Sequence, residues 1–412
     1  MRVLWVKAGK LLPVDTGGKI RSYNLLRLLA NDYKITLLSY YGGPQDPAYE
    51  AALAQEPFTS ETICTPAPGP SAIAQGLDYL WRLPMKPPYA ISKFTHRAIR
   101  RALAQRLTSG RFDVAVCDFL APSANFPRRL PIPCVLFQHN VESSLWERRA
   151  QVESNPVKRV SYTLESAKML RFERDVLDRF HHVIAVSDHD RQQMLEMNPS
   201  CKITVVPTGV DTQKFRVAPP SSAQPPRVVF TGSMDWEPNI DAVEYFCLEI
   251  WPRILAEIPD AVFQIVGRNP HAKVQRLASP SVEVTGTVPS VEEYIEKASV
   301  IVVPLRAGGG TRLKIFEAMA KGRAMVSTSI GAEGLEVESG SDLLLADNPS
   351  DFADAVIRLL RDNDLRHKIE QGAVRLAARY DWSSVVKHFG KVLDLLPGSA
   401  KVHESAAAST RL

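Results

Sequence analysis

Residues 300–338, VIVVPLRAGGGTRLKIFEAMAKGRAMVSTSIGAEGLEVE, constrain the fold of this chain more than any other stretch. An apolar run of the kind that makes a buried strand comes first and is followed by three glycines and by a helical pattern over 312–321. A second β-branched run, 324–328, leads into another glycine-rich loop. This order predicts a strand–loop–helix–strand crossover within a parallel sheet.

The first glycine loop of this stretch lies where the expected strand ends and the expected helix begins. Free backbone N–H groups and the helix dipole favour an anion there, most often a phosphate. Arg312 and Lys314 would place two cations beside that anion, and Glu317 would add one carboxylate. The combination predicts a site for a phosphorylated sugar-nucleotide. A plainer interpretation is a glycine-rich loop that only turns the chain.

The same alternation of strands and helices fills the rest of the chain, in two halves. A proline- and serine-rich segment without periodicity, 217–226, predicts the linker between them. The expected parts are a Rossmann-like domain over 1–216, a second one over 227–381, a helix over 382–397 that returns to the first domain, and a disordered tail over 398–412. With 412 residues, two domains with separate cores are the default. The fold class is therefore α/β, with two doubly wound domains facing across a cleft.

Two places in the first half carry polar residues at the ends of expected strands. Gly17 and Gly18 open a helix after the first strand, where backbone can approach a phosphate, although no GxGxxG fingerprint is present. His139 and Glu142 directly follow the expected strand 134–138. Ligands bind at the carboxyl edge of such sheets. We therefore take His139 and Glu142 as candidate catalytic residues, with a simple strand-capping histidine as the alternative.

Segments 42–88 and 91–107 have different expected roles. The former is proline-rich, and we expect it to be irregular with one or two surface helices. The latter, ISKFTHRAIRRALAQRL, has an apolar stripe flanked by arginines, within a stretch that contains no Asp or Glu. A basic amphipathic helix can lie on an anionic membrane surface. The alternative is a surface helix whose stripe packs on its own domain.

Composition limits the cellular setting of the protein. The five cysteines are scattered singly, which argues against a disulfide framework or a zinc site and fits a reducing cytosol. The N-terminal apolar run is too short for a signal peptide, and no stretch is long enough to span a bilayer. We expect a cytoplasmic protein, or a peripheral one at the inner face of the membrane, with no nucleic-acid partner.

Several motifs together resemble one enzyme family. They are FTGSMDWEPN (230–239), VTGTV (284–288), PLRAGGGTRLKIFEAMAKG (304–322) and TSIGAEGL (328–335), with looser matches in TGGKIRSYNLL, QHNVES and HHVIAVSDHDRQQML. This set resembles glycosyltransferase family 4, whose members are retaining enzymes with the two-Rossmann GT-B fold. The resemblance covers nearly the whole chain up to about residue 396.

The resemblance implies roles for particular residues. Glu317 would bind the ribose hydroxyls of the donor nucleotide, and Val288 would lie where backbone holds the base. Gly17 and Gly18 would face the donor's phosphate or sugar. The remaining implied donor-binding residues are Gly232, Ser233, Gly308, Gly309, Gly310 and Thr311.

The sequence departs from the family pattern in two places. The family's first motif glutamate is replaced by Gly309, and the usual Arg and Lys are missing from GSMDWEPN. We expect Arg312 and Lys314 to supply the diphosphate's counter-charge instead. The lost glutamate raises the alternative of a non-catalytic sugar-nucleotide-binding protein.

The implied reaction is transfer of a sugar from a nucleotide-diphosphate-sugar donor to a glycan or lipid-linked acceptor. The enzyme would be a hexosyltransferase of exopolysaccharide or cell-envelope glycan synthesis. No Asp-x-Asp cluster suited to Mg²⁺ is present, so we expect neither a metal nor another cofactor. A sugar-nucleotide epimerase of the same fold is a further alternative, but the additional acid/base carboxylates that it needs are not identifiable.

Overall fold

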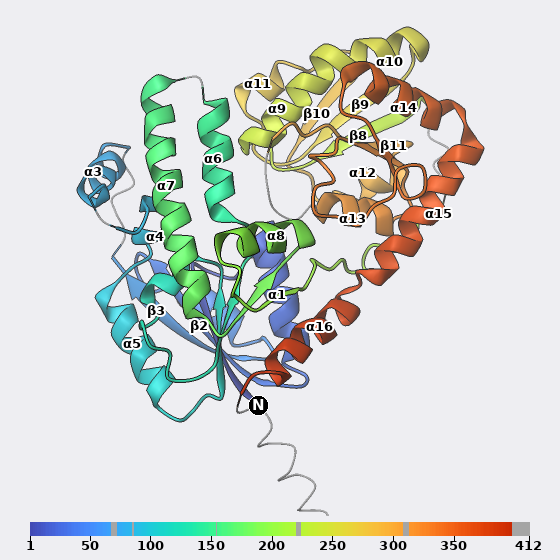
Figure 1. The fold of residues 1–412 in the computed structure, drawn as a ribbon. Coiled ribbons are helices and arrows are strands. Elements are labelled where there is room, and N and C mark those ends of the chain that lie inside the picture. Colours follow the sequence, from blue (N-terminus) through green and yellow to red (C-terminus); the bar gives the residue numbers. More distant parts are fainter. Residues whose placement is uncertain (67–71, 85, 154, 220–223, 308–312, 398–412) are drawn as a thin grey trace, which may run out of the picture. The chain divides into compact units, whose positions relative to one another are not determined.

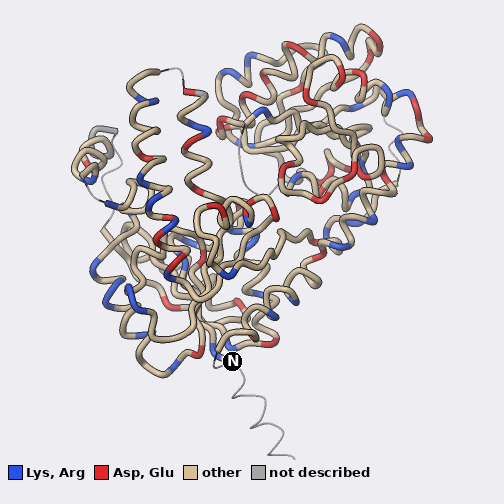
Figure 2. Tube along the Cα trace, viewed as in Figure 1, with Lys and Arg blue, Asp and Glu red and all other residues tan. Residues whose placement is uncertain are grey.

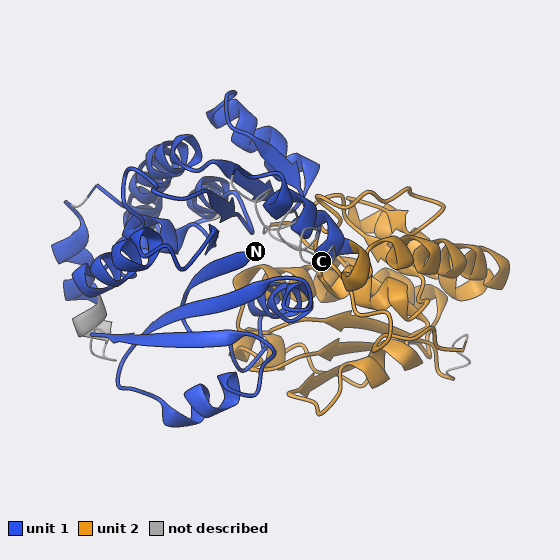
Figure 3. Cartoon of the chain, turned by 90° about the horizontal axis from the view of Figure 1, so that it is seen from below, with its two compact units in different colours: residues 1–207, 385–412 blue, residues 208–384 orange. Residues whose placement is uncertain are grey.

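The computed structural model describes residues 1–397 apart from 67–71, 85, 154, 220–223 and 308–312, with the side chains of 72–75 and 152 also left out. Two compact units divide the chain: unit 1 is Met1–Pro207 with Val385–Leu412, and unit 2 is Thr208–Ser384. Figure 1 labels the elements, and Figure 3 colours the two units. Among the described helices, none combines the length and the apolar character needed to cross a bilayer.

Unit 1 is built on a seven-stranded parallel sheet in the order β3-β2-β1-β4-β5-β6-β7. Its central strands are apolar and buried on both faces, as parallel strands covered by helices must be. The strands are β1 (Arg2–Ala8), β2 (Lys34–Gly42), β3 (Thr59–Thr65), β4 (Val114–Asp118), β5 (Cys134–Phe137), β6 (His182–Ala185) and β7 (Ile203–Val205).

Helices connect and cover these strands. They are α1 (Gly17–Leu29), α2 (Pro47–Leu53), α3 (Ala72–Arg82), α4 (Tyr89–Ser92), α5 (Arg97–Thr108), the 3-10 helix η1 (Ala121–Asn125), α6 (Glu142–Val152), α7 (Pro156–Arg179), α8 (Asp188–Met197) and α16 (Trp382–Asp394). Helix α16, although last in the chain, packs on this sheet. Its Phe389 stacks on Trp5 with ring centroids 5.4 Å apart and meets Phe137 edge-on at 5.2 Å.

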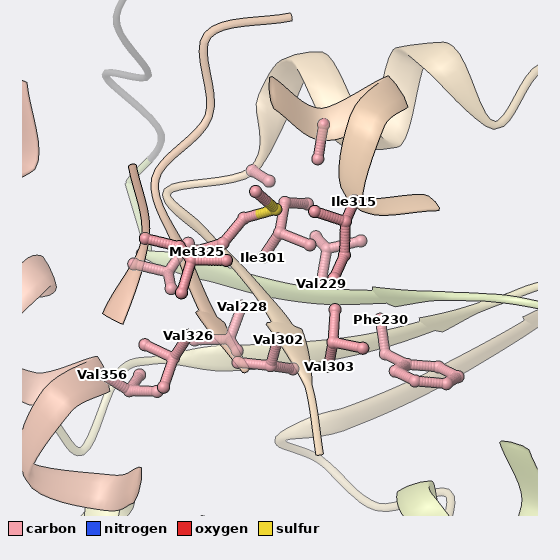
Figure 4. Packing of buried hydrophobic residues seen from close by; sticks show 14 of the residues in the cluster. Val228, Val229, Phe230, Ile301, Val302, Val303, Ile315, Met325, Val326 and Val356 are labelled. Carbon is pink, nitrogen blue, oxygen red and sulfur yellow. The ribbon is translucent and has the colours of Figure 1, made fainter. Parts of the chain in front are cut away.

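Unit 2 has a second parallel sheet, in the order β10-β9-β8-β11-β12-β13. Its strands are β8 (Arg227–Thr231), β9 (Val262–Val266), β10 (Val282–Gly286), β11 (Val300–Val303), β12 (Met325–Ser327) and β13 (Leu344–Leu345). Figure 4 shows the core of this sheet, where valines of β8, β11 and β12 pack beside Ile315 and Val356 of the flanking helices. The expected crossover over residues 300–328 is therefore present.

The helices of unit 2 follow the strands in alternation. They are α9 (Glu237–Tyr245), the π-helix η2 (Phe246–Ile250), α10 (Trp251–Glu257), α11 (Ala272–Gln275), α12 (Glu292–Lys297), α13 (Leu313–Ala320), α14 (Pro349–Arg361) and α15 (Asn363–Arg379). The first three form one continuous helical stretch along the chain. Helix α13 belongs to the crossover and begins directly after the undescribed residues 308–312.

The segment 42–88 is more regular than the sequence indicated, because it contains the edge strand β3 as well as α2 and α3. β3 pairs with β2 in parallel along its whole length. Its sequence, TSETICT, is polar, and only Thr65 is buried. An edge strand needs no apolar run, so periodicity could not reveal it.

The expected basic helix 91–107 is interrupted and is not a free amphipathic surface. Residues 93–96 separate α4 from α5, and the apolar face of α5 is buried in the core of unit 1. Ile99 and Leu103 are fully buried. Arg106 forms an ion pair with Glu61 of β3. The face that would enter a membrane is thus covered by its own domain.

The units divide earlier than the expected boundary at 216. Val210 and Phe215 are buried in the core of unit 2. In addition, the Thr212 hydroxyl donates a hydrogen bond of 2.6 Å to Asp381. The segment after Pro207 therefore folds with unit 2, which ends at Ser384 instead of 381.

The expected linker 217–226 is not free along its described part. The N–H of Ala218 donates to the Lys321 carbonyl at 3.1 Å. The guanidinium of Arg323, which is completely buried, donates to the Pro219 carbonyl at 2.6 Å. These bonds attach the start of the segment to the C-terminal end of α13.

Candidate functional site

The carboxyl edge of the unit 1 sheet carries a buried charge network. Lys7 is the next-to-last residue of β1, Asp118 ends β4, and His139 lies two residues beyond β5. One oxygen of Asp118 accepts hydrogen bonds from the Lys7 ammonium and the Trp5 indole, both at 3.0 Å, and the other bonds the His139 Nε2 at 2.8 Å. The Lys7 ammonium also donates to Ser22 of α1 at 2.9 Å. All of these groups are buried.

The protonation of this network follows from its contacts. Burial raises the pKa of the Asp118 carboxyl, but the Lys7 charge and the His139 hydrogen bond outweigh it and hold the pKa below its usual range. Burial, reinforced by Arg21, lowers the pKa of His139 to about 3. His139 is therefore neutral at pH 7 and donates from Nε2, because an ionised carboxylate only accepts. Its Nδ1 is buried and bonds no described residue.

Phe119 covers the imidazole of His139. The two rings stack with centroids 3.6 Å apart, and the Lys7 ammonium lies 4.9 Å from the Phe119 centroid. The backbone of Phe119 has a φ of 77°, in the left-handed region that residues other than glycine rarely adopt. Such a strained conformation persists only where the surrounding structure holds it. A Cβ added to Gly18 would lie 2.4 Å from the Phe119 ring. Gly18 is thus required by packing, and its contact with a donor stays a prediction.

The start of α1 is the other predicted feature of this edge. Gly17 is exposed, and Thr16 before it makes no side-chain capping hydrogen bond. Arg21, four residues along the helix from Gly17, is completely buried. Burial lowers the pKa of its guanidinium to about 9, while Asp190 and Asp118 oppose the shift. Arg21 and Lys7 make the interior of this edge rich in cations.

Glu142 does not hold the His139 side chain. The imidazole is held by Asp118, and the backbone N–H of Glu142 donates to Glu173 of α7 at 3.0 Å. Burial raises the pKa of the half-buried Glu142 carboxyl, against a hydrogen bond from Asn140. Glu142 begins α6, where the helix dipole favours its charge.

The carboxyl edge of the unit 2 sheet brings three predicted donor-binding residues together: Gly232, Ser233 and Lys314. The Lys314 ammonium lies 4.1 Å from the Phe230 ring centroid and donates to the side chain of Asn239 at 3.0 Å. Asn239 in turn donates to the Ser233 carbonyl at 2.9 Å. A Cβ added to Gly232 would lie 2.7 Å from the Asn239 amide and 3.1 Å from the Lys314 ammonium. Only glycine fits here without displacing these groups.

Arg268, from the loop after β9, also reaches this edge. Its Nε donates to the Ser233 hydroxyl at 3.0 Å, and that hydroxyl donates to Asp235 at 2.6 Å. A Cβ on Gly267 would lie 1.6 Å from the Gly232 carbonyl oxygen, so the two loops touch through backbone. The sequence lacks the family's arginine in the GSMDWEPN loop, but the structure places Arg268 beside that loop.

Glu317 lies one turn after Lys314 on α13. The carboxyl is half-buried and forms no hydrogen bond with a described residue. Burial raises its pKa, while the Lys214 and Lys314 charges lower it and Glu292 raises it. Residues three apart share a helix face, so Glu317 and Lys314 point to the same side.

Of the remaining predicted donor-binding residues, the structure describes only Val288. Val288, two residues after β10, is half-buried against the unit 2 core. Gly308, Gly309, Gly310, Thr311 and Arg312 lie outside the described residues.

Sequence reasoning missed several polar residues of both edges. Asp118 and Lys7 lie at the C-terminal ends of apolar strands, near which His139 also lies, and that position was the available signal. Arg21, Glu173, Asn239 and Arg268 lie within helices or loops, where no local pattern distinguishes them from surface residues. Among the described residues, no group of three or more His, Cys, Asp or Glu is arranged to hold a metal.

Solved structures similar to this chain identify its fold. Sucrose-phosphate synthase from Thermosynechococcus elongatus aligns with a TM-score of 0.68 and 18% identity, over 95% of this chain and 98% of that one. Anabaena HepE in complex with UDP and glucose aligns with a TM-score of 0.65 and 13% identity, over 96% and 99%. At these identities the likeness shows the fold alone, and the fold is GT-B, as the sequence predicted.

Sequence comparison then gives the family. The Glycosyltransferase Family 4 model matches residues 18–214, and the Glycosyl transferases group 1 model matches residues 225–362. The chain belongs to glycosyltransferase family 4. Phosphatidyl-myo-inositol mannosyltransferase of Mycolicibacterium smegmatis is 30% identical over 237 residues, which are 55% of this chain and 60% of that protein. The chain thus matches less than two thirds of this relative's length.

Proposed function

We propose that this protein is a retaining glycosyltransferase that moves a sugar from a nucleotide-diphosphate-sugar to a glycan or lipid-linked acceptor in exopolysaccharide or cell-envelope synthesis. One observation carries the proposal. The Lys314 ammonium lies against Gly232, and Glu317 follows it on the same face of α13 without a hydrogen bond to any described residue. A cation beside a glycine suits a diphosphate, and a carboxylate suits paired ribose hydroxyls.

The leaving group explains the charges on this edge. Departure of a nucleoside diphosphate develops negative charge, which fixed cations and backbone N–H groups stabilise. Lys314 and Arg268 would supply that charge here, with Arg312 as a further expected cation. The family membership, the UDP and glucose in HepE, and the mannosyltransferase relative support the proposal.

His139 would act by position instead of by proton transfer. Its imidazole is neutral, buried and covered by Phe119, so no general base is offered at its Nδ1 without movement of that ring. The network with Asp118 fixes the backbone that follows β5. We propose that this backbone contributes to the site.

Two measurements test the proposed function: binding of a nucleotide-sugar, and then release of nucleoside diphosphate from it. Thermal unfolding should shift upward with at least one member of a panel of UDP-, GDP- and ADP-linked sugars. With that donor, slow release of nucleoside diphosphate in the absence of acceptor is expected. Binding without any release, with or without candidate acceptors, would leave a sugar-nucleotide-binding protein. No shift with any member would contradict the proposal.

An acceptor in a membrane would require a docking surface, and unit 1 offers one on α3 and α7. These helices are joined by a 2.6 Å hydrogen bond between the Tyr79 and Ser161 hydroxyls. Their exposed apolar side chains include Leu77, Leu80, Trp81, Val157, Val160 and Leu164. Exposed Lys158 and Arg159 belong to α7, and exposed Lys86 follows α3 four residues after its end. Figure 2 colours the Lys and Arg positions along the chain. We propose that this surface, and not α5, contacts an anionic bilayer.

Co-sedimentation with vesicles tests this surface. Wild type should sediment with phosphatidylcholine vesicles that contain phosphatidylglycerol, and less with phosphatidylcholine alone. The double variant Leu80→Glu/Trp81→Glu should lose the binding, whereas Arg101→Glu on α5 should keep most of it. Equal loss in both variants would show simple charge attraction, and no binding by wild type would refute the surface.

A further inference from the structure

Glu173, in the second half of α7, is a completely buried carboxylate surrounded by donors. One oxygen accepts from the Gln138 amide at 2.8 Å and from the Glu142 N–H at 3.0 Å. The other accepts from the Ser143 N–H at 3.0 Å and from the Ser143 hydroxyl at 2.6 Å. All four donors belong to the short segment between β5 and the first turn of α6, and this segment carries His139.

The two anchor points enclose His139 along the chain. Gln138 precedes it and is also fixed by its own N–H, which donates to the Ile184 carbonyl at 2.9 Å. Glu142 and Ser143 follow and receive from Glu173 the cap that the first residues of α6 need, since Val141 makes no side-chain cap. Asp118 holds the His139 side chain, while Glu173 holds its backbone from both sides.

We propose that Glu173 is a positioning residue that keeps the segment 138–143, and with it His139, in the arrangement that sugar transfer requires. This proposal rests on the proposed function where activity is measured. The surroundings of His139 can be measured even if the protein transfers no sugar.

Four donors around one carboxyl demand its ionised form. A carboxylate accepts at about four positions, whereas a protonated carboxyl would direct its own O–H at one of the donors and break that bond. Burial raises the pKa of Glu173 to about 7, and the Ser143 hydroxyl opposes this shift most strongly. Glu142 of α6 is the charged neighbour that raises it further; Gln138 beside β5 is neutral, as is Met197 of α8 behind Ser143.

Stability and activity should therefore depend on pH in opposite directions. The folded pKa lies above the ordinary value of 4.5, so the folded state binds the proton more tightly. The contribution of Glu173 to stability is fully present below 4.5 and is lost as pH rises through about 7. The ordered segment needs the carboxylate, so activity should rise over the same range.

The test uses Glu173→Gln with Glu165→Gln as a matched control. Glu165 is another buried carboxylate of α7, but its partners are the Tyr89 N–H at 2.6 Å and the Lys168 ammonium at 3.6 Å, neither of which belongs to the segment 138–143. Glu173→Gln should lower kcat by about tenfold and flatten its pH profile near 7, with nucleotide-sugar binding unchanged. Glu165→Gln should keep the wild-type profile.

A second variant and a second measurement keep the proposal testable if Glu173→Gln folds poorly. Ser143→Ala removes the strongest opposing hydrogen bond and should move the midpoint of the activity profile to higher pH. The ¹⁵N signals of His139 should change near pH 7 in wild type and not in Glu173→Gln, whether or not the protein turns over a donor. The proposal would be overturned if Glu173→Gln and Ser143→Ala both kept the wild-type pH profile of activity. It would also be overturned if the ¹⁵N signals of His139 changed with pH in Glu173→Gln as they do in wild type. Failure of all nucleotide-sugars to bind would instead refute the proposed function.

Discussion

The carboxyl edges of the two sheets use charge in different ways. In unit 1 the cation, carboxylate and imidazole of Lys7, Asp118 and His139 are buried and bonded to one another. In unit 2 Lys314 bonds a neutral amide, and Glu317 is half-buried with no hydrogen bond to a described residue. A closed, buried network fixes geometry, whereas the half-buried Glu317 carboxyl has acceptor oxygens that a ligand could use. We therefore expect the first edge to hold the local structure in place and the second edge to bind the donor, as proposed above.

Asp118→Asn should have the largest effect, because it leaves the buried Lys7 ammonium without its counter-charge. Removing one partner of a buried ion pair costs about 3–5 kcal/mol, and urea unfolding of the variant should show a loss of that order. Asp113→Asn is the matched control at the opposite end of β4, where Asp113 pairs with the exposed Arg2 at 2.6 Å. Its loss should be much smaller. Equal losses would show that the network is not a buried structural unit.

Lys314→Met should weaken donor binding with little change in unfolding free energy. Loss of a charge-assisted hydrogen bond corresponds to roughly tenfold to hundredfold in affinity, measurable by calorimetry with the nucleotide-sugar found in the screen. Lys273→Met removes an exposed lysine of the same unit and should leave affinity unchanged. If both variants bind like wild type, the second edge is not the donor site.

Glu317→Gln tests the unit 2 edge through the pH dependence of donor affinity. Burial raises the pKa of Glu317 above its ordinary 4.5, so the ionised form that accepts ribose hydroxyls is lost at a higher pH than for an exposed glutamate. Donor affinity of wild type should fall as pH is lowered toward that range, and the variant should be weaker by about tenfold with a flatter dependence. A wild-type pH dependence in the variant would assign the titration to another group.

Gly18→Ala should destabilise unit 1 through the ring of Phe119. The new methyl would lie 2.4 Å from that ring, and overpacking of this kind costs about 1–3 kcal/mol. Gly76→Ala, on α3 where nothing lies within 4 Å of the new methyl, should be neutral or slightly stabilising. Urea unfolding measures both. If Gly18→Ala is as stable as wild type but binds the donor weakly, Gly18 contacts the donor instead of serving packing.

The smallest expected effect is that of a chelator. Lys314 and the other cations would neutralise the leaving group, so turnover should be unchanged in EDTA and unaffected by added Mg²⁺. Loss of turnover in EDTA with recovery in Mg²⁺ would show that the second edge is completed by a metal.

Much of unit 2 could be predicted because its signals are local. Apolar runs marked β8, β9 and β11, and glycines marked the loops that follow them. The family resemblance implied that Gly232 binds the donor, and the structure places it beside Lys314 at one sheet edge. The edge strand β3 was missed because its half-exposed residues need no apolar pattern. The break between α4 and α5 was missed because the helical stripe continues across it.

The sequence by itself determined the two α/β units, the glycine loops and the family, because all three depend on short-range patterns of residue type. Only the tertiary structure decided which polar residues become functional neighbours. Asp118 binds Lys7 across 111 positions of the chain, and Glu173 binds Ser143 across 30. Such pairs exist because burial makes an unsatisfied polar group costly, so each must find a partner wherever the fold brings one.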